Sequence, residues 1–160
     1  PEYLISIEPP AAGDAGMSCK GMLGQEALLA FAVKDAEVAD YHYRFYHAIA
    51  ELVAAHAKGI PQGYVELLEE ELQRRGHGEV DEASWQLKQE LDGSPRRFRA
   101  YAKQSFIDTL TLYLHGICCD IDVEPGPRQL PSHLLRRRLR FLKQLYPPPQ
   151  GYAVLPEDLR

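Results

Sequence analysis

The sequence has few cysteines and no long apolar run, and these two absences exclude several classes of protein. Its longest apolar segment, residues 27–33, is far shorter than the ~20 residues that span a bilayer. The three cysteines, Cys19, Cys118 and Cys119, are odd in number and two are adjacent, which makes a poor disulfide framework. No basic segment is followed by an apolar one, so we expect no signal peptide. We therefore predict a cytoplasmic protein without a membrane partner.

The sequence also lacks a basic surplus and a complete phosphate-binding loop. Its net charge of −5 argues against a dedicated nucleic-acid binder, because such proteins neutralise phosphates with Lys and Arg. Gly16 and Gly21 have the spacing of a phosphate loop, but Met22 and Leu23 stand where that motif needs Lys and a hydroxyl residue. The composition thus disfavours nucleic acid as a partner, and the nucleotide motif is rejected.

Helical periodicity dominates what is present. Apolar residues make up 45% of the 160 residues, as in an ordinary globular protein of one domain. Apolar positions recur at helical spacing in six segments, which end near glycines or prolines. These segments are about residues 23–33, 37–58, 61–75, 81–91, 95–118 and 132–146. We therefore predict an all-α fold, a single domain (residues 1–160) of five or six helices in an irregular bundle.

The two ends of the chain lack the helical pattern of the six segments. Residues 2–8 alternate at strand period, and we expect them to pair with residues 152–155 or 121–123. Residues 1–21 form this strand and a loop that leads into the helices. Three consecutive prolines begin residues 147–160, which we predict to be an extended tail.

An aromatic and histidine-rich segment, residues 41–56, suggests a ligand pocket. The candidate lining residues are Tyr41, His42, Phe45, Tyr46 and His56. His42 and His56 share a helix face, but fourteen residues separate them by about 21 Å, so one ion cannot reach both. No histidine has a glutamate three residues before it, which excludes a di-iron carboxylate motif. We expect ordinary core and surface positions here, with a small-ligand, haem or metal-binding pocket as the alternative.

The cysteines do not form a convincing metal site either. Cys118 and Cys119 diverge by about 100° on a helix, and no Cys-x-x-Cys partner exists elsewhere. Cys19 lies beside Lys20 without a base nearby in the sequence. We therefore predict no metal site, no cofactor and no catalytic residue.

The most unusual feature is a cluster of basic residues in the last helix, with Arg136, Arg137, Arg138 and Arg140 on the same segment as Leu135, Leu139 and Leu142. Three interpretations compete. The arginines form a solvated face, they pair with an acidic surface of this chain or of a partner, or they bind nucleic acid. The glutamates at positions 66, 69, 70 and 71 offer the acidic surface within the chain.

These patterns favour a protein-binding module over an enzyme. Charged helix faces and Trp85, which lies off the apolar stripe of its helix, are typical of interaction surfaces. We expect an adaptor, an immunity (toxin-neutralising) protein or a chaperone that binds another protein or a second copy of itself. Its predicted contacts are Arg136, Arg137, Arg140 and Trp85. The alternatives are the ligand-binding helix of residues 41–56 and nucleic-acid binding through the arginine cluster.

Overall fold

The computed structural model describes residues 4–5, 18–23, 26–31, 38–56, 59–118, 128–150 and 152. Side chains are described at position 29 and over 41–56, 59–116, 128–150 and 152. The chain divides into two compact units, Pro1–Ile49 and Ala50–Arg160. One helix crosses this division, so the expectation of a single domain stays a prediction.

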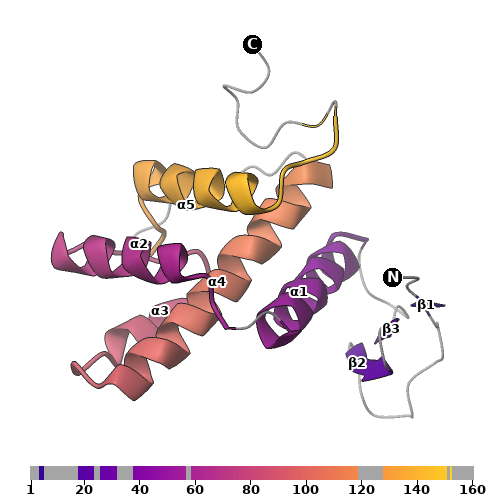
Figure 1. The fold of residues 1–160 in the computed structure, drawn as a ribbon, viewed down its shortest axis with the longest axis horizontal. Coiled ribbons are helices and arrows are strands. Elements are labelled where there is room, and N and C mark those ends of the chain that lie inside the picture. The colour runs from indigo at the N-terminus through magenta and orange to yellow at the C-terminus, as the bar shows by residue number, and fades with distance from the viewer. Residues whose placement is uncertain are drawn as a thin grey trace. The chain divides into compact units, whose positions relative to one another are not determined.

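The predicted helical fold is confirmed by five helices within the described residues. They are α1 (Val38–His56), α2 (Gln62–Gln73), α3 (Glu82–Gln89), α4 (Pro95–Cys118) and α5 (Ser132–Leu145) (Figure 1). Each end lies within two residues of its predicted position, because glycine and proline interrupt the chain between the helices. None of these helices is long and apolar enough to cross a membrane.

The prediction of a helix over residues 23–33 is wrong. The first unit contains a three-stranded sheet of β1 (Leu4–Ile5), β2 (Ser18–Leu23) and β3 (Glu26–Phe31), in the order β1-β3-β2. Strand β3 pairs antiparallel with β2 and parallel with β1, where Leu4 lies opposite Leu28. The strand expected at residues 2–8 therefore exists over its centre and pairs with β3, whereas the partner segments proposed for it lie almost wholly outside the described residues.

A short apolar run explains the error. Residues 27–33 are all apolar, and such a run fits a buried strand and a buried helix equally well. Strand β3 itself has six residues, a length typical of strands, whereas helices usually need about ten or more. Two residues beginning with Gly24 separate β2 from β3, which is a hairpin signal in the sequence. Leu29, in the middle of β3, is buried.

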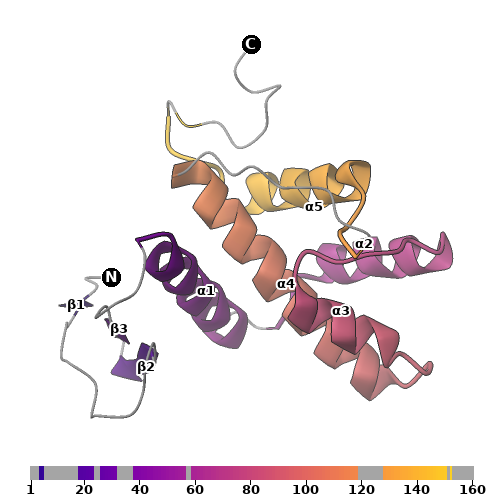
Figure 2. The same cartoon turned by 180° about the vertical axis from the view of Figure 1, so that it is seen from behind.

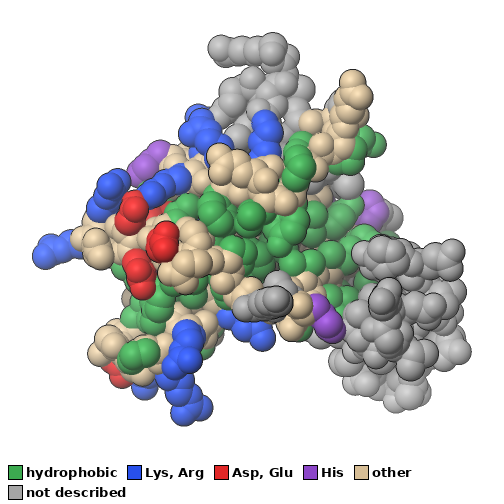
Figure 3. Space-filling model, viewed as in Figure 1, with side chains coloured by type: hydrophobic (Ala, Val, Ile, Leu, Met, Phe, Trp, Pro, Cys, Tyr) green, Lys and Arg blue, Asp and Glu red, His purple; other side chains and the backbone are tan. Residues whose placement is uncertain are grey.

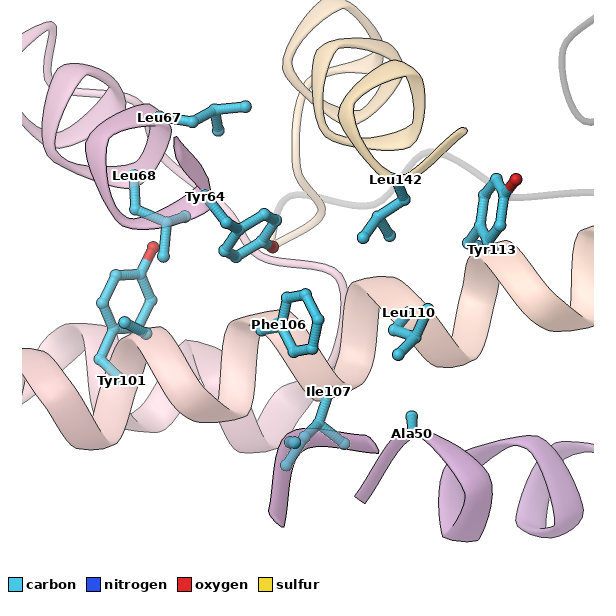
Figure 4. Packing of buried hydrophobic residues seen from close by; sticks show 12 residues of the cluster. Ala50, Tyr64, Leu67, Leu68, Tyr101, Phe106, Ile107, Leu110, Tyr113 and Leu142 are labelled. Carbon is cyan, nitrogen blue, oxygen red and sulfur yellow. The ribbon is translucent and has the colours of Figure 1, made fainter. Parts of the chain in front are cut away.

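Helix α4 is the centre of the second unit. It contacts α2, α3 and α5, and both ribbon views show it running diagonally between them (Figure 1 and Figure 2). Its buried side chains meet the other helices in one apolar cluster that includes Tyr64, Phe106, Leu110 and Leu142 (Figure 4). The rings of Tyr64 and Phe106 pack edge to face with centroids 5.3 Å apart. The sequence predicts this central place for α4, because its second half is apolar on nearly all sides.

Two loops meet beside the apolar cluster. The segment between α2 and α3 pairs with the segment before α5 through the backbone of Glu79, whose N–H donates to Arg128 O and whose carbonyl accepts from Leu130 N–H. Gly78 has φ +78°, and a Cβ there would lie 2.1 Å from Gln129 O. Only glycine permits this approach.

After α5, the structure describes only residues 146–150 and 152. Tyr113 donates its hydroxyl hydrogen to Tyr146 O at the end of α5. Tyr152 N–H donates to Pro149 O, so the chain turns there instead of staying extended. The rest of the predicted tail, like the two partner segments proposed for the first strand, lies almost wholly outside the described residues.

The loop contact leads to a paired prediction for two glycines. Gly78→Ala adds a steric clash to an unfavourable backbone angle, whereas Gly93→Ala adds only the angle, since φ is +85° and nothing lies within 4 Å of its Cβ. We expect Gly93→Ala to lower the free energy of unfolding by about 1 kcal/mol, and Gly78→Ala by about 1–3 kcal/mol more. Urea unfolding of both variants checks this, and equal losses would contradict the close approach.

Candidate functional site

Arg138 projects from the buried side of α5 and is fully inaccessible to solvent. Its guanidinium has five N–H donors, and each has an acceptor within the bundle. Glu71, at the end of α2, accepts two at 3.1 and 2.6 Å. Glu79, in the loop before α3, accepts two at 2.7 and 3.0 Å, and Ser105 Oγ on α4 accepts one at 2.9 Å. One side chain thus links four parts of the second unit.

A second cation completes a buried ion network, which we define as Arg138, Glu71, Glu79 and Lys88. Lys88 Nζ on α3 donates to Glu79 Oε1 at 3.2 Å and to Gly78 O at 2.9 Å. Tyr101 also donates to Glu79 Oε1, at 2.5 Å. Two cations therefore face two carboxylates, and their formal charges balance. Buried charges are tolerated when they are paired and hydrogen-bonded in this way.

The pKa shifts in the network follow from this pairing. Burial by itself would raise the pKa of Glu79, but the hydrogen bond and charge of Arg138, together with Lys88 and Tyr101, lower it below the ordinary value. Burial would lower the pKa of Arg138, yet the neighbouring Tyr64 and the carboxylates of Glu79 and Glu71 raise it well above normal. Burial and the neighbouring Glu79 charge raise the pKa of Tyr101. Near neutral pH, Glu79 and Arg138 therefore stay charged and Tyr101 stays neutral. Fixed protonation states suit a structural role and not proton transfer.

The arginine cluster of α5 therefore divides into an inner and an outer part. Arg137, next to Arg138, forms an ion pair with Glu70 of α2 at 2.5 Å, and both side chains are partly exposed. This hydrogen bond and charge lower the pKa of Glu70. Pairing of the basic and acidic helices within one chain, one of three alternatives from the sequence, thus holds for Arg137 and Arg138.

The outer side of α5 carries basic and polar side chains and no acidic one. Arg136, Arg140 and His133 are exposed there, with Lys143 half-buried beside them. The space-filling view shows Lys and Arg side chains over α5, and Asp and Glu side chains over neighbouring α2 (Figure 3). We call Arg136, Arg140 and His133 the basic face of α5. It can attract carboxylates or phosphates, because guanidinium forks suit both.

A pocket of about 320 Å³ lies where the C-terminal end of α2 meets the start of α5. Its basic lining residues are Arg74, Arg75, His77, His133 and Arg137. Helix α5 begins there without a side-chain cap, so its first N–H groups add partial positive charge. A second pocket, between α3 and α4, differs in that its Arg97 donates to Glu90 O at 2.7 Å and faces Asp92.

Arg75 adopts an unusual backbone conformation beside the first pocket. Its φ is +56°, and no other described non-glycine residue has a positive φ. Arg75 N–H donates to Leu72 O and Gly76 N–H to Glu71 O, the two bonds of a Schellman cap. Glycine is the usual residue at the left-handed position of this cap. Here arginine takes that position and glycine follows it.

The other predicted site residues lie on α1 and α3. Trp85 is half-buried on α3. On α1, Tyr41, Phe45 and Tyr46 are half-buried, whereas His42 and His56 are exposed, and His56 Nδ1 lies 2.9 Å from Leu52 O of its own helix. Both pockets described above are lined by other residues. The described residues contain no group of three or more His, Cys, Asp or Glu side chains placed to bind a metal ion. The ligand-pocket alternative stays untested.

The structure describes no cysteine side chain. Cys19 lies in β2 and not in the predicted loop, and Cys118 ends α4. Cys119 lies outside the described residues.

The sequence prediction missed the buried ion network, although a signal for it exists. Arg138 falls three residues after Leu135 and four before Leu142, on the apolar stripe of its helix. Glu71 falls likewise four residues after Leu67. A charged residue on an apolar stripe indicates a buried partner of opposite charge. No such periodicity marks Glu79, which lies in a loop.

Comparisons of the chain with protein-family models, with curated proteins and with solved structures find no match.

The network predicts very different effects for two arginines of α5. Arg138→Met leaves Glu71 and Glu79 buried without their main partner, so we expect the free energy of unfolding to fall by about 3–5 kcal/mol. Arg136→Met, two residues away and exposed, should change it by less than about 0.5 kcal/mol. Chemical unfolding measured by circular dichroism compares them. Similar effects for both variants would contradict the buried position of Arg138.

The lowered pKa of Glu79 predicts a loss of stability in acid. Its stabilising effect is complete above the unfolded-state pKa, about 4.3, and disappears as the pH falls through the lower folded-state value. The difference in free energy of unfolding between the wild type and Glu79→Gln should therefore shrink below about pH 4.3. Urea titrations over a pH series measure it, and a constant difference would show that Glu79 is not an ionised partner.

Proposed function

We propose that this chain is a non-enzymatic protein-binding module that binds an acidic segment of a partner protein through the basic face of α5. The supporting observation is the division of α5. Its inward arginine, Arg138, is buried against carboxylates of the same chain, and its outward side exposes the basic residues Arg136, Arg140 and His133 to solvent. Charge of one sign on an exposed helix face speeds encounter with an opposite charge and selects the partner.

The ion pair between Arg137 and Glu70 has a separate role in this proposal. It lies at the border between the basic face and the glutamates of α2, and it uses part of the Arg137 charge within the chain. We therefore assign binding mainly to Arg136 and Arg140. Trp85 lies on α3, and the proposal does not depend on it.

Two further occupants of the basic face are distinguishable from an acidic protein segment. Exposed Glu66 and Glu69 of α2 offer an acidic surface on a second copy of the chain, which would make the module self-associate. Nucleic acid would use the same guanidinium groups, and its affinity would fall steeply with salt. We propose that the binding occurs in the cytoplasm, because an odd cysteine count with adjacent cysteines fits a reducing compartment.

Charge reversal tests the basic face. A fluorescent oligo-glutamate peptide should bind the wild type, and Arg136→Glu with Arg140→Glu should weaken that binding by at least about tenfold. The matched control, Arg96→Glu with Arg99→Glu, makes the same change of net charge at the exposed start of α4, away from α5 (Figure 2). It should leave affinity within about twofold of the wild type. Fluorescence anisotropy gives the affinities, and circular dichroism confirms that both variants fold.

Three outcomes would overturn the proposal. Equal loss in both variants would mean that only net charge matters. Tighter binding of an oligonucleotide, lost with Arg136 and Arg140, would assign the face to nucleic acid. A wild-type dimer that these substitutions dissociate would assign it to self-association. In a lysate, the expected result is one acidic protein captured by the wild type and by the control variant, and lost with the reversed α5.

A further inference from the structure

The pocket between α2 and α5 is lined by more basic than acidic side chains among the described residues. Glu71, its acidic lining residue, already accepts two hydrogen bonds from Arg138. Arg137 is paired with Glu70. Arg74 and Arg75 are both exposed and form no ion pair within 4.0 Å with a described carboxylate, although the charge of Arg74 contributes to lowering the pKa of Glu70. Two guanidinium charges therefore face the pocket, with His77 and His133 beside them.

The position of Arg75 is a second observation at the same pocket. The left-handed conformation, φ +56°, costs an L-residue free energy that glycine avoids. Residues in such conformations cluster at binding sites, where the strained position places a functional side chain. Here it brings a guanidinium to the pocket wall, while the cap would form equally well with glycine.

We propose that this pocket binds a phosphate monoester, namely a phosphorylated side chain within the acidic segment of the partner. This inference rests on the proposed function and names the group that the partner presents. A phosphate monoester carries about −1.5 to −2 charges and three acceptor oxygens, which match two guanidinium groups and two imidazoles that each carry at least one N–H donor. A carboxylate has one charge and would leave one arginine uncompensated. His133 lines the pocket and also belongs to the basic face of α5, so the flanking acidic residues of one peptide can reach that face.

Three acidic peptides of one sequence test the pocket. The first has serine at its centre, and the second has phosphoserine at the same place. In the third, a pair of aspartates replaces the serine and matches the charge of the phosphate. The wild type should bind the phosphoserine peptide at least about tenfold more tightly than the aspartate peptide. Arg75→Gly should reduce this preference to less than about threefold. Arg96→Gln, which removes one positive charge elsewhere, should keep the preference.

Folding is separable from binding in this experiment. Glycine suits the left-handed position, so Arg75→Gly should unfold at a temperature no lower than the wild type. Loss of the preference then reports the side chain and not a damaged fold. Inorganic phosphate should displace the phosphoserine peptide more effectively than sodium chloride of equal ionic strength.

The outcomes distinguish the two proposals. Equal affinity for the phosphoserine and aspartate peptides, or an unchanged preference in Arg75→Gly, overturns the phosphate pocket and leaves the acidic-partner module standing. Failure of all three peptides to bind overturns both. With Arg136→Glu and Arg140→Glu, all three affinities should fall while the ratio between phosphoserine and aspartate persists. A ratio lost in that variant would place the phosphate on the basic face, against the pocket.

Discussion

The second unit depends on the hydrogen bonds and ion pairs that the guanidinium of Arg138 forms. The guanidinium connects α5 to the end of α2, to the loop before α3 and to α4, and every one of its N–H donors is used. Replacement of such a network by apolar side chains of equal volume is often neutral or stabilising, because the four charged groups had to leave water. The effect of the network is geometric. We infer that it fixes the rotation of α5 against α2, since a turned helix would leave Glu71 buried without Arg138 and Glu79 with Lys88 alone.

The surface follows from that buried arrangement. With Arg138 turned inward, helical spacing of about 100° per residue turns Arg136 and Arg140 toward solvent and Arg137 toward α2. The contact between α2 and α5 also brings Arg75, the left-handed residue after α2, beside the first turn of α5. These residues form part of the basic pocket. One side of α5 therefore carries the buried Arg138, and the other side carries the proposed binding surface. A substitution in the network would be expected to disturb both.

Local rules account for the parts of the fold that the sequence predicted well. Helices α1 to α5 end where Gly59, Gly76, Gly93 and the prolines interrupt the chain, and these signals lie next to the residues they affect. The sequence alone predicts a helix in place of strand β3, because the apolar run of residues 27–33 has no period to distinguish the two. Its identity comes from pairing with β1 and β2, and pairing is not a property of the segment alone.

The sequence by itself determined where the helices of this protein lie and that an excess of arginine collects on the last one, since periodicity, glycine, proline and composition act over a few residues. Only the tertiary structure decided what each arginine does. The partners of Arg138 come from positions 71, 79 and 105, and the pocket joins Arg74 and Arg75 to His133. Contacts between residues so far apart depend on how whole helices pack, and side-chain periodicity within one helix does not encode that packing.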